Sequence, residues 1–281
     1  MSLHSKNNTA SADSFLLQAD DIAEISVAEV DARLQRDHFV CLRGLFDRAE
    51  IAAGVASLRA GFSAERDQPA AGEKPGAVMQ NFQKLAIGGN DQAWVYNPRF
   101  VRVMYNPLWA DDIYGLRGIF RRLAQVRNRL EGYELDYAVD QVQDRLWTAS
   151  RVQHYPAGGG FMGPHRDVVL ETVERDSGVE KFYQILLLLT TKGADFERGG
   201  AFIDTETGRI DLEAQAGAGD ILIYSGRSLH GVEDIDPHRV LRLDRLEGRL
   251  VAMVSLYKDM SGEKELFGNY ADRKQKRQSF A

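Results

Sequence analysis

The stretch RLWTASRVQHYPAGGGFMGPHRD, residues 145–167, opens a series of short apolar runs that decides the fold. Eight such runs, separated by Gly, Pro and Asp, occupy residues 145–156, 164–173, 182–191, 199–208, 208–217, 219–226, 230–235 and 247–257. Short apolar runs bounded by turn residues are typical of β-strands. Eight antiparallel strands in about 110 residues predict a jelly roll, the cupin-like double-stranded β-helix, whose mouth can hold a ligand. We therefore expect a mainly β fold with some α-helix.

The residues before this region carry helical patterns and predict an N-terminal helical layer. Ser26 precedes an apolar stripe of Val27, Val30 and Leu34, so we expect a helix to begin near Ser26. A strand is predicted over residues 38–46, because this mostly apolar run, HFVCLRGLF, ends at a predicted turn. The N-terminal half as a whole is expected to be mostly helical.

Two more helices are predicted in this half. Asp47 is a suitable N-cap, and Glu50 three residues later predicts a capping box. Residues 111–131 have the strongest helical pattern, with an apolar stripe of Ile113, Leu116, Ile119, Leu123, Val126 and Leu130. Between these helices, residues 63–76 are rich in Ala, Gly, Pro and charge, which predicts a loop.

The length and composition favour one large domain. A chain of 281 residues, 44% hydrophobic and 27% charged, can bury a full core. We expect a single domain over residues 14–258, with the helical layer over about 14–144 and the jelly-roll core over about 145–258. Residues 1–13 are expected to form a flexible leader, and residues 259–281 a polar tail.

Several function classes are disfavoured by composition. No apolar run approaches the roughly 20 residues that cross a bilayer, and the polar N-terminus lacks a secretory signal pattern, so we expect no membrane partner and a cytoplasmic location. The single cysteine, Cys41, excludes an intramolecular disulfide and a zinc site of several thiolates. A net charge of −6 argues against a nucleic-acid partner and favours a small-molecule substrate. The oligomeric state is not indicated.

A metal site is predicted from histidine and carboxylate spacing. His165 and Asp167 are two residues apart, so on a strand their side chains share one face, while Arg166 points away. His230, which follows the strand GDILIYSG, is the best third ligand. Two histidines and one carboxylate form the facial arrangement that leaves positions open on Fe(II). The remaining histidines are in the leader, at the start of an early strand, on the opposite strand face and in a turn: His4, His38, His154 and His238.

A glycine motif offers an alternative. Gly158, Gly160 and Gly163 match the G-x-G-x-x-G dinucleotide fingerprint, but Pro164 and a strand-like run follow instead of a helix. A nucleotide-dependent dehydrogenase becomes the main rival only if residues 165–175 are helical. A non-catalytic metal- or sugar-binding jelly roll is a third possibility, because a fold does not determine a function.

The chain resembles the Fe(II)- and 2-oxoglutarate-dependent dioxygenases, in the small-molecule branch related to phytanoyl-CoA hydroxylase and clavaminate-type enzymes. The resemblance is carried by HYPAGGGFMGPHRD, GGAF, AGDILIYSGRSLHGV and GRLVAMVSLY within residues 145–257, and by HFVCLRGLFDRAEI near the N-terminus. It implies His165, Asp167 and His230 as ligands of Fe(II), with 2-oxoglutarate and O2 as co-substrates. It also implies hydroxylation, or another oxidation, of a small organic molecule such as an amino acid or a natural-product intermediate.

The resemblance further implies an arginine that binds the distal carboxylate of 2-oxoglutarate after the second histidine. Arginine suits this task because its planar fork donates two parallel hydrogen bonds. Arg239 has the spacing closer to that of the family, but it lies in a turn, whereas Arg249 leads the apolar strand LVAMVSLY. We therefore favour Arg249 over Arg239.

Three more residues are predicted to bind the co-substrate. Gln153 and Tyr155 share a strand face, at the position where some relatives carry an Asn-x-Tyr pair that contacts it. Gln184 leads the run ILLLL, and a buried amide needs partners. It can bond a co-substrate carboxylate or make a structural hydrogen bond, and Tyr183 should face the other sheet surface.

Overall fold

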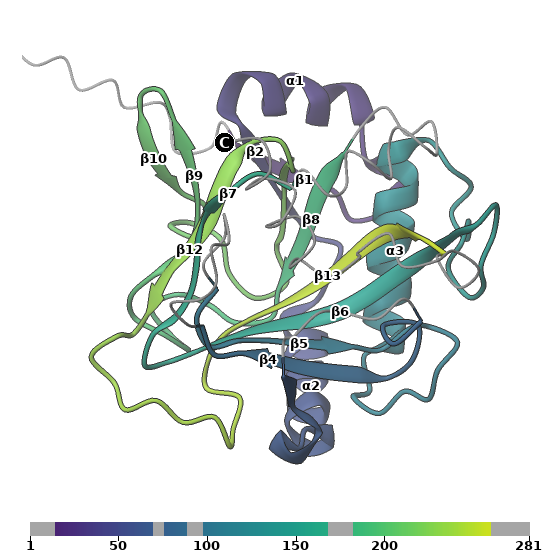
Figure 1. The fold of residues 1–281 in the computed structure, drawn as a ribbon. Helices are drawn as coiled ribbons and strands as arrows, with labels where there is room; N and C mark the ends of the chain where they lie inside the picture. Colours follow the sequence, from purple (N-terminus) through teal and green to yellow (C-terminus); the bar gives the residue numbers. More distant parts are fainter. Residues whose placement is uncertain (1–14, 70–75, 89–97, 168–181, 260–281) are drawn as a thin grey trace, which may run out of the picture.

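The computed structural model describes residues 15–69, 76–88, 98–167 and 182–259, and its strands form two sheets (Figure 1). In spatial order, the large sheet contains β1 (Leu16–Gln18), β2 (Phe39–Arg43), β11 (Ile221–Ser225), β8 (Tyr183–Leu188), β13 (Gly248–Lys258), β6 (Leu146–Pro156), β5 (Val101–Tyr105), β4 (Phe82–Ala86) and β3 (Gln68–Pro69). The small sheet contains β10 (Gly208–Asp211), β9 (Gly200–Thr205), β12 (Leu229–Ile235) and β7 (Gly160–His165).

Three α-helices accompany the sheets: α1 (Val27–Asp37), α2 (Arg48–Gly61) and α3 (Arg117–Glu131). Two short 3-10 helices, η1 (Ile22–Glu24) and η2 (Ala64–Arg66), complete the described elements. The fold is thus mainly β with few helices and one large sheet, as the sequence predicts. Among the described helices, none is both long and apolar enough to cross a membrane.

The large sheet has two buried faces with different neighbours. Its outer face packs against the helices in one apolar cluster, to which β6 contributes Val152, β13 contributes Leu250, and α3 contributes Phe120 and Leu123. Its inner face turns toward the small sheet (Figure 1). Because side chains alternate along a strand, the neighbours of Val152 at odd-numbered positions of β6 point into the space between the sheets. This arrangement directs Gln153 and Tyr155 toward the interior, as predicted.

The predicted strands between residues 145 and 257 are largely confirmed. Seven of the eight runs contain the strands β6 and β8 to β13 at the expected places. The run 164–173 is the exception, because β7 spans Gly160–His165 and so begins before it. The remainder of that run, residues 168–173, lies outside the described residues. Tyr183 faces the outer surface of the sheet, as predicted. Its hydroxyl donates to Asp31 Oδ1 at 2.5 Å.

The predicted composition of the N-terminal half is partly wrong. The half is not mostly helical, because β1 to β5 extend the large sheet on both edges. The predicted loop over residues 63–76 contains η2 and β3 in its described part. The leader 1–13, with His4, lies outside the described residues, as does all of the tail 259–281 except Asp259.

The three predicted helices form, with two corrections at their N-termini. Ser26 caps α1 by accepting a hydrogen bond from Glu29 N, as expected. Asp47 likewise caps α2 through Ala49 N at 2.6 Å. The predicted capping box is wrong, however, because the carboxylate of Glu50 accepts a hydrogen bond from Arg122 instead.

The second correction concerns α3, which begins at Arg117 and not at residue 111. Gly115 has a φ of +68°, which is not helical. The carboxylate of Asp112 then accepts hydrogen bonds from the backbone N–H groups of Leu116 and Arg117. These groups would otherwise be unsatisfied at the helix start, so Asp112 fixes where the helix begins.

Candidate metal centre

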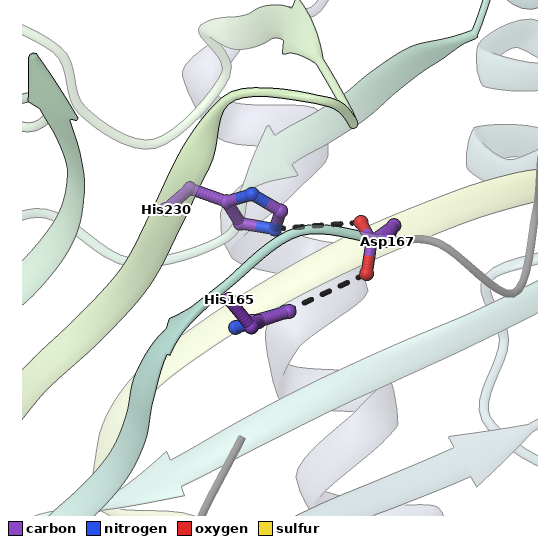
Figure 2. Close-up of side chains that lie close together, drawn as sticks. All are labelled: His165, Asp167 and His230. Atoms are coloured by element: carbon purple, nitrogen blue, oxygen red, sulfur yellow. Dashed lines mark ion pairs between the residues drawn. The ribbon is translucent and has the colours of Figure 1, made fainter. Parts of the chain in front are cut away.

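His165 and His230 meet where the strands β7 and β12 pair. The two residues are direct partners in this antiparallel pair, so their side chains leave the sheet on the same face. Their ring centroids lie 4.3 Å apart. Asp167 follows β7 by two residues, and its backbone N–H donates to the carbonyl of Gly226 at 2.9 Å. That bond holds Asp167 beside the turn that leads into β12, and Figure 2 shows the three side chains converging.

Backbone hydrogen bonds orient both imidazole rings. His165 Nδ1 lies 2.8 Å from the carbonyl oxygen of Gly163, and His230 Nδ1 lies 2.8 Å from that of Ser228. A carbonyl oxygen can only accept, so each Nδ1 carries a proton. Each Nε2 then points toward Asp167, where it can donate to the carboxylate when protonated, or offer a lone pair to a metal ion when the ring is neutral. The Nε2 atoms lie 3.5 and 3.4 Å from the two carboxylate oxygens of Asp167.

The three side chains can hold a metal ion. One ligand atom from each of His165, Asp167 and His230 lies within 4.8 Å of the other two. His165 is 9% exposed and His230 5% exposed, so the histidines are largely removed from solvent. Fixing the ring orientation through the second nitrogen is characteristic of metal-binding histidines.

The electrostatics at Asp167 favour its ionised form. Burial by itself raises the pKa of this carboxyl group. Hydrogen bonds and positive charge from His165 and His230 outweigh burial and leave the pKa well below its usual range. In addition, the side-chain amide of Gln184 donates a hydrogen bond to Asp167 Oδ2. Gln184 thus makes a hydrogen bond within the protein, to the carboxylate of Asp167, and its predicted contact with a co-substrate carboxylate stays a prediction.

Arg249 lies buried at the start of β13. It is a direct strand partner of Tyr155 on β6, and its side chain is fully buried. Its Nε donates to Oε1 of the buried Glu213 at 2.6 Å. Within the described part of the chain, neither Nη1 nor Nη2 of Arg249 has a hydrogen-bond partner. The guanidinium group thus retains a fork of unused donors inside the protein.

One tyrosine lies beside this fork, and another lies beside the metal cluster. The ring of Tyr155 is 5.2 Å from Arg249 Cζ, and its hydroxyl donates to Gln153 Oε1 at 3.0 Å. Burial raises the pKa of Tyr155 to about 12; the positive charge of Arg249 opposes this rise, and the negative charge of Asp167 adds to it. The ring of Tyr224 lies 4.9 Å from that of His230.

Arg239, the alternative to Arg249, lies outside this interior. Its side chain is exposed and pairs with Asp236 and Glu247 at 3.6 and 3.8 Å. A surface arginine with two carboxylate partners is not available to a ligand in the space between the two sheets.

The described histidines outside the predicted ligand set have other environments. His154 is fully buried on the outer face of β6, between Arg102 and the carbonyl oxygen of Glu247. Burial lowers the pKa of His154 to about 3, so it is neutral and structural. His38 ends α1 in a left-handed conformation, and the exposed His238 lies 3.8 Å from Glu197.

Three further residues of the interior are not predicted by the sequence patterns. Alternation along β11 could have identified Tyr224, because it lies two residues after the buried Leu222 and therefore on the same face of the strand. Arg151 could also have been found, because it precedes Gln153 by two residues on the same face of β6. Glu213 carries no local pattern, since only the distant pairing of strands brings it to Arg249.

The glycine motif forms a tight connection between β6 and β7. Gly158 has a φ of +99°, and a Cβ at Gly160 would lie 2.6 Å from the carbonyl carbon of Tyr155. Gly160 and Gly163 lie on β7, so no helix follows the motif as far as Asp167. Residues 168–175, the rest of the segment that would need to be helical, lie outside the described residues.

Comparisons with known proteins give structural neighbours only. No family model and no curated protein matches the sequence. The chain is similar to a prolyl-4-hydroxylase from Pseudomonas putida, with 15% identity, coverage of 83% of this chain and 99% of that chain, and a TM-score of 0.49.

Two further similar structures are 2OG-Fe(II) oxygenase family proteins. The one from Caulobacter crescentus has 16% identity, coverage of 95% and 98%, and a TM-score of 0.49. The one from Burkholderia pseudomallei has 14% identity, coverage of 86% and 96%, and a TM-score of 0.46.

Proposed function

We propose that this protein is a Fe(II)- and 2-oxoglutarate-dependent oxygenase that hydroxylates, or otherwise oxidises, a small organic molecule. The observation that carries the proposal is the convergence of two histidine Nε2 atoms and one ionised carboxylate near a buried arginine with unused donors. An amino acid or a natural-product intermediate is the substrate class that we propose.

The ligand set fits ferrous iron. His165 and His230 would hold the ion through Nε2, and Asp167 would hold it through a carboxylate oxygen. Two imidazoles and one carboxylate leave coordination positions open, which is characteristic of non-heme Fe(II) oxygenases. When bound, Fe(II) together with 2-oxoglutarate and O2 supplies the oxidation of a C–H bond, coupled to formation of succinate and CO2. Gln184 keeps Asp167 oriented by donating to its Oδ2.

The interior also fits the co-substrate. A buried guanidinium group is costly unless acceptors satisfy its hydrogen bonds, and neither NH2 group of Arg249, at Nη1 or at Nη2, has an acceptor among the described residues. We assign Arg249 to the distal carboxylate of 2-oxoglutarate. Tyr155 and Gln153, which are hydrogen-bonded to each other on the same interior face, would line its binding site.

The strand order supports a double-stranded β-helix as the framework. From β6 to β13 the chain passes repeatedly between the sheets: β6, β8, β11 and β13 lie in the large sheet, and β7, β9, β10 and β12 in the small sheet. Eight antiparallel strands divided in this way make a jelly roll. The helices α1 to α3 would then form the layer outside the barrel.

The alternatives explain less of the interior. A non-catalytic metal- or sugar-binding jelly roll needs no buried arginine with a free fork. A nucleotide-dependent dehydrogenase needs a strand that leads through the glycines into a helix, whereas Gly160 and Gly163 are themselves part of β7.

The test is turnover of 2-oxoglutarate by protein that has been loaded anaerobically with Fe(II) and then exposed to O2. We expect the protein to form succinate slowly when no other organic substrate is added. Succinate should form faster with those members of a panel of amino acids and metabolites that are a substrate or a close analogue. The variant His165→Ala should form none, whereas the matched control His238→Ala, in an exposed histidine, should behave as the unmodified protein. Absence of succinate with the unmodified protein across the panel would contradict the proposal.

A further inference from the structure

The ion pair between Glu213 and Arg249 is buried and incompletely satisfied. Glu213 is 2% exposed and Arg249 0% exposed. They share one hydrogen bond, from Arg249 Nε to Glu213 Oε1 at 2.6 Å. Three polar atoms of this pair, Nη1 and Nη2 of Arg249 and Oε2 of Glu213, have no partner among the described residues. Buried polar atoms without partners are rare in proteins, and three in one ion pair indicate that a ligand belongs there.

The contact between the two residues leaves the arginine fork open. Glu213 Oε1 accepts two hydrogen bonds, from Arg249 Nε and from the backbone N–H of Ala201 on β9 at 2.8 Å. These bonds fix the carboxyl group from two sides and engage only the Nε edge of the guanidinium. The two Nη atoms can therefore bind a second carboxyl group in the bidentate way. That second group would lie next to Glu213 Oε2.

The net charge of the buried pair determines the protonation state in which a second carboxyl group can bind. The charges of Arg249 and Glu213 cancel, so a carboxylate ligand would leave one net negative charge in a buried place. The other titratable groups whose charges act on the tyrosines of this site are Tyr155 on β6, Tyr224 on β11, Asp167 and Arg151. Of these only Arg151 is positive, and its guanidinium group donates to Ala149 O and to Ser255 Oγ, six residues along β13 from Arg249. Two carboxyl groups that share a buried site do not both ionise, so the site has to gain one proton.

We propose, on the basis of the function proposed above, that Glu213 and Arg249 bind the distal carboxyl group of 2-oxoglutarate as one unit that takes up a proton. Arg249 donates two hydrogen bonds through Nη1 and Nη2. One proton, which comes from solvent, is shared between the ligand carboxyl group and Glu213 Oε2. All three unpartnered atoms are then satisfied, and the buried site is neutral.

The variant Glu213→Gln separates this role from a structural one. The amide oxygen of glutamine can accept from Arg249 Nε and Ala201 N as Oε1 does. Its NH2 group takes the place of Oε2 and donates to an ionised carboxylate, so no proton is needed. The matched control is Glu247→Gln, which alters an exposed carboxylate on the surface.

The experiment is calorimetric titration of the Fe(II)-loaded protein with 2-oxoglutarate, without O2, in buffers of different ionisation enthalpy and at several pH values. For the unmodified protein and Glu247→Gln we expect uptake of about one proton, and a Kd that rises about tenfold per pH unit on the alkaline side. For Glu213→Gln we expect no uptake and a Kd that does not depend on pH. Binding to the unmodified protein without proton uptake, or equal uptake in Glu213→Gln, would overturn the inference alone. Failure of the unmodified protein to bind 2-oxoglutarate would overturn the proposed function as well.

Discussion

Replacement of Arg249 by lysine separates the fork of the arginine from its charge. Lysine keeps a cation beside Glu213, but a single ammonium group cannot reproduce two parallel donors. A hydrogen bond to a charged group contributes about 1.5–3 kcal/mol, so the loss of one should weaken 2-oxoglutarate binding roughly 10- to 150-fold. The substitution Arg249→Leu is less informative, because it leaves Glu213 buried without a partner and lowers the free energy of unfolding by about 3–5 kcal/mol.

The assay is the dissociation constant for 2-oxoglutarate, measured with Fe(II) present and O2 absent. Affinity for Fe(II) should be unchanged, because Arg249 is not one of the proposed ligands. These are His165 on β7, Asp167 two residues after β7, and His230 on β12. The control is Arg239→Lys, whose side chain pairs with surface carboxylates. If Arg239→Lys weakens binding and Arg249→Lys does not, the anchor is Arg239. If neither weakens it, the reasoning about a co-substrate in this interior is refuted.

Other substitutions test the parts around the site. Gln184→Leu removes the hydrogen bond to Asp167 and should lower Fe(II) affinity about 10- to 100-fold in a metal titration; unchanged affinity would place its role elsewhere. Burial lowers the pKa of His154 to about 3. When the pH falls below the ordinary pKa of histidine, the unfolded chain therefore binds a proton that the native state excludes. Its contribution to stability is present near pH 7 and is lost as the pH falls, by about 2 kcal/mol between pH 7 and pH 5 in urea unfolding, and His154→Gln should lack it. Gly231→Ala would place a Cβ 2.6 Å from Met162 O, and should reduce the free energy of unfolding by about 1–3 kcal/mol; an unchanged Tm would show that β12 can shift.

The strand-rich half of the fold was predictable because its patterns are local. Apolar runs between turn residues located seven of the eight expected strands. Alternation along β6 was enough to direct Gln153 and Tyr155 inward and His154 outward. The same period of two placed His165 and Asp167 on one face, although β7 ends at His165.

The N-terminal half was less predictable because tertiary pairing decides its structure. The strands β1, β4 and β5 are short, and each is formed by pairing within a sheet whose centre lies elsewhere in the sequence, whereas β2 lies inside the strand predicted over residues 38–46. The start of α3 depends on one glycine with a positive φ and on the carboxylate of Asp112, which the apolar stripe does not reveal.

Glu213 illustrates the same limit within the site. It follows β10 and meets Arg249, 36 residues later in the chain, only because the two sheets face each other. No sequence motif beside either residue predicts that the two side chains form a buried ion pair. A single sequence therefore predicted the arginine but not the acid that holds it.

Binding of Fe(II) by His165, Asp167 and His230 is the central claim, and an anaerobic titration tests it most directly. The unmodified protein should bind one Fe(II) per chain. His165→Ala and His230→Ala should each lose most of the affinity, because each removes one of three protein ligands. His238→Ala should bind as the unmodified protein does. Fe(II) affinity that is unchanged in both His165→Ala and His230→Ala would contradict the account.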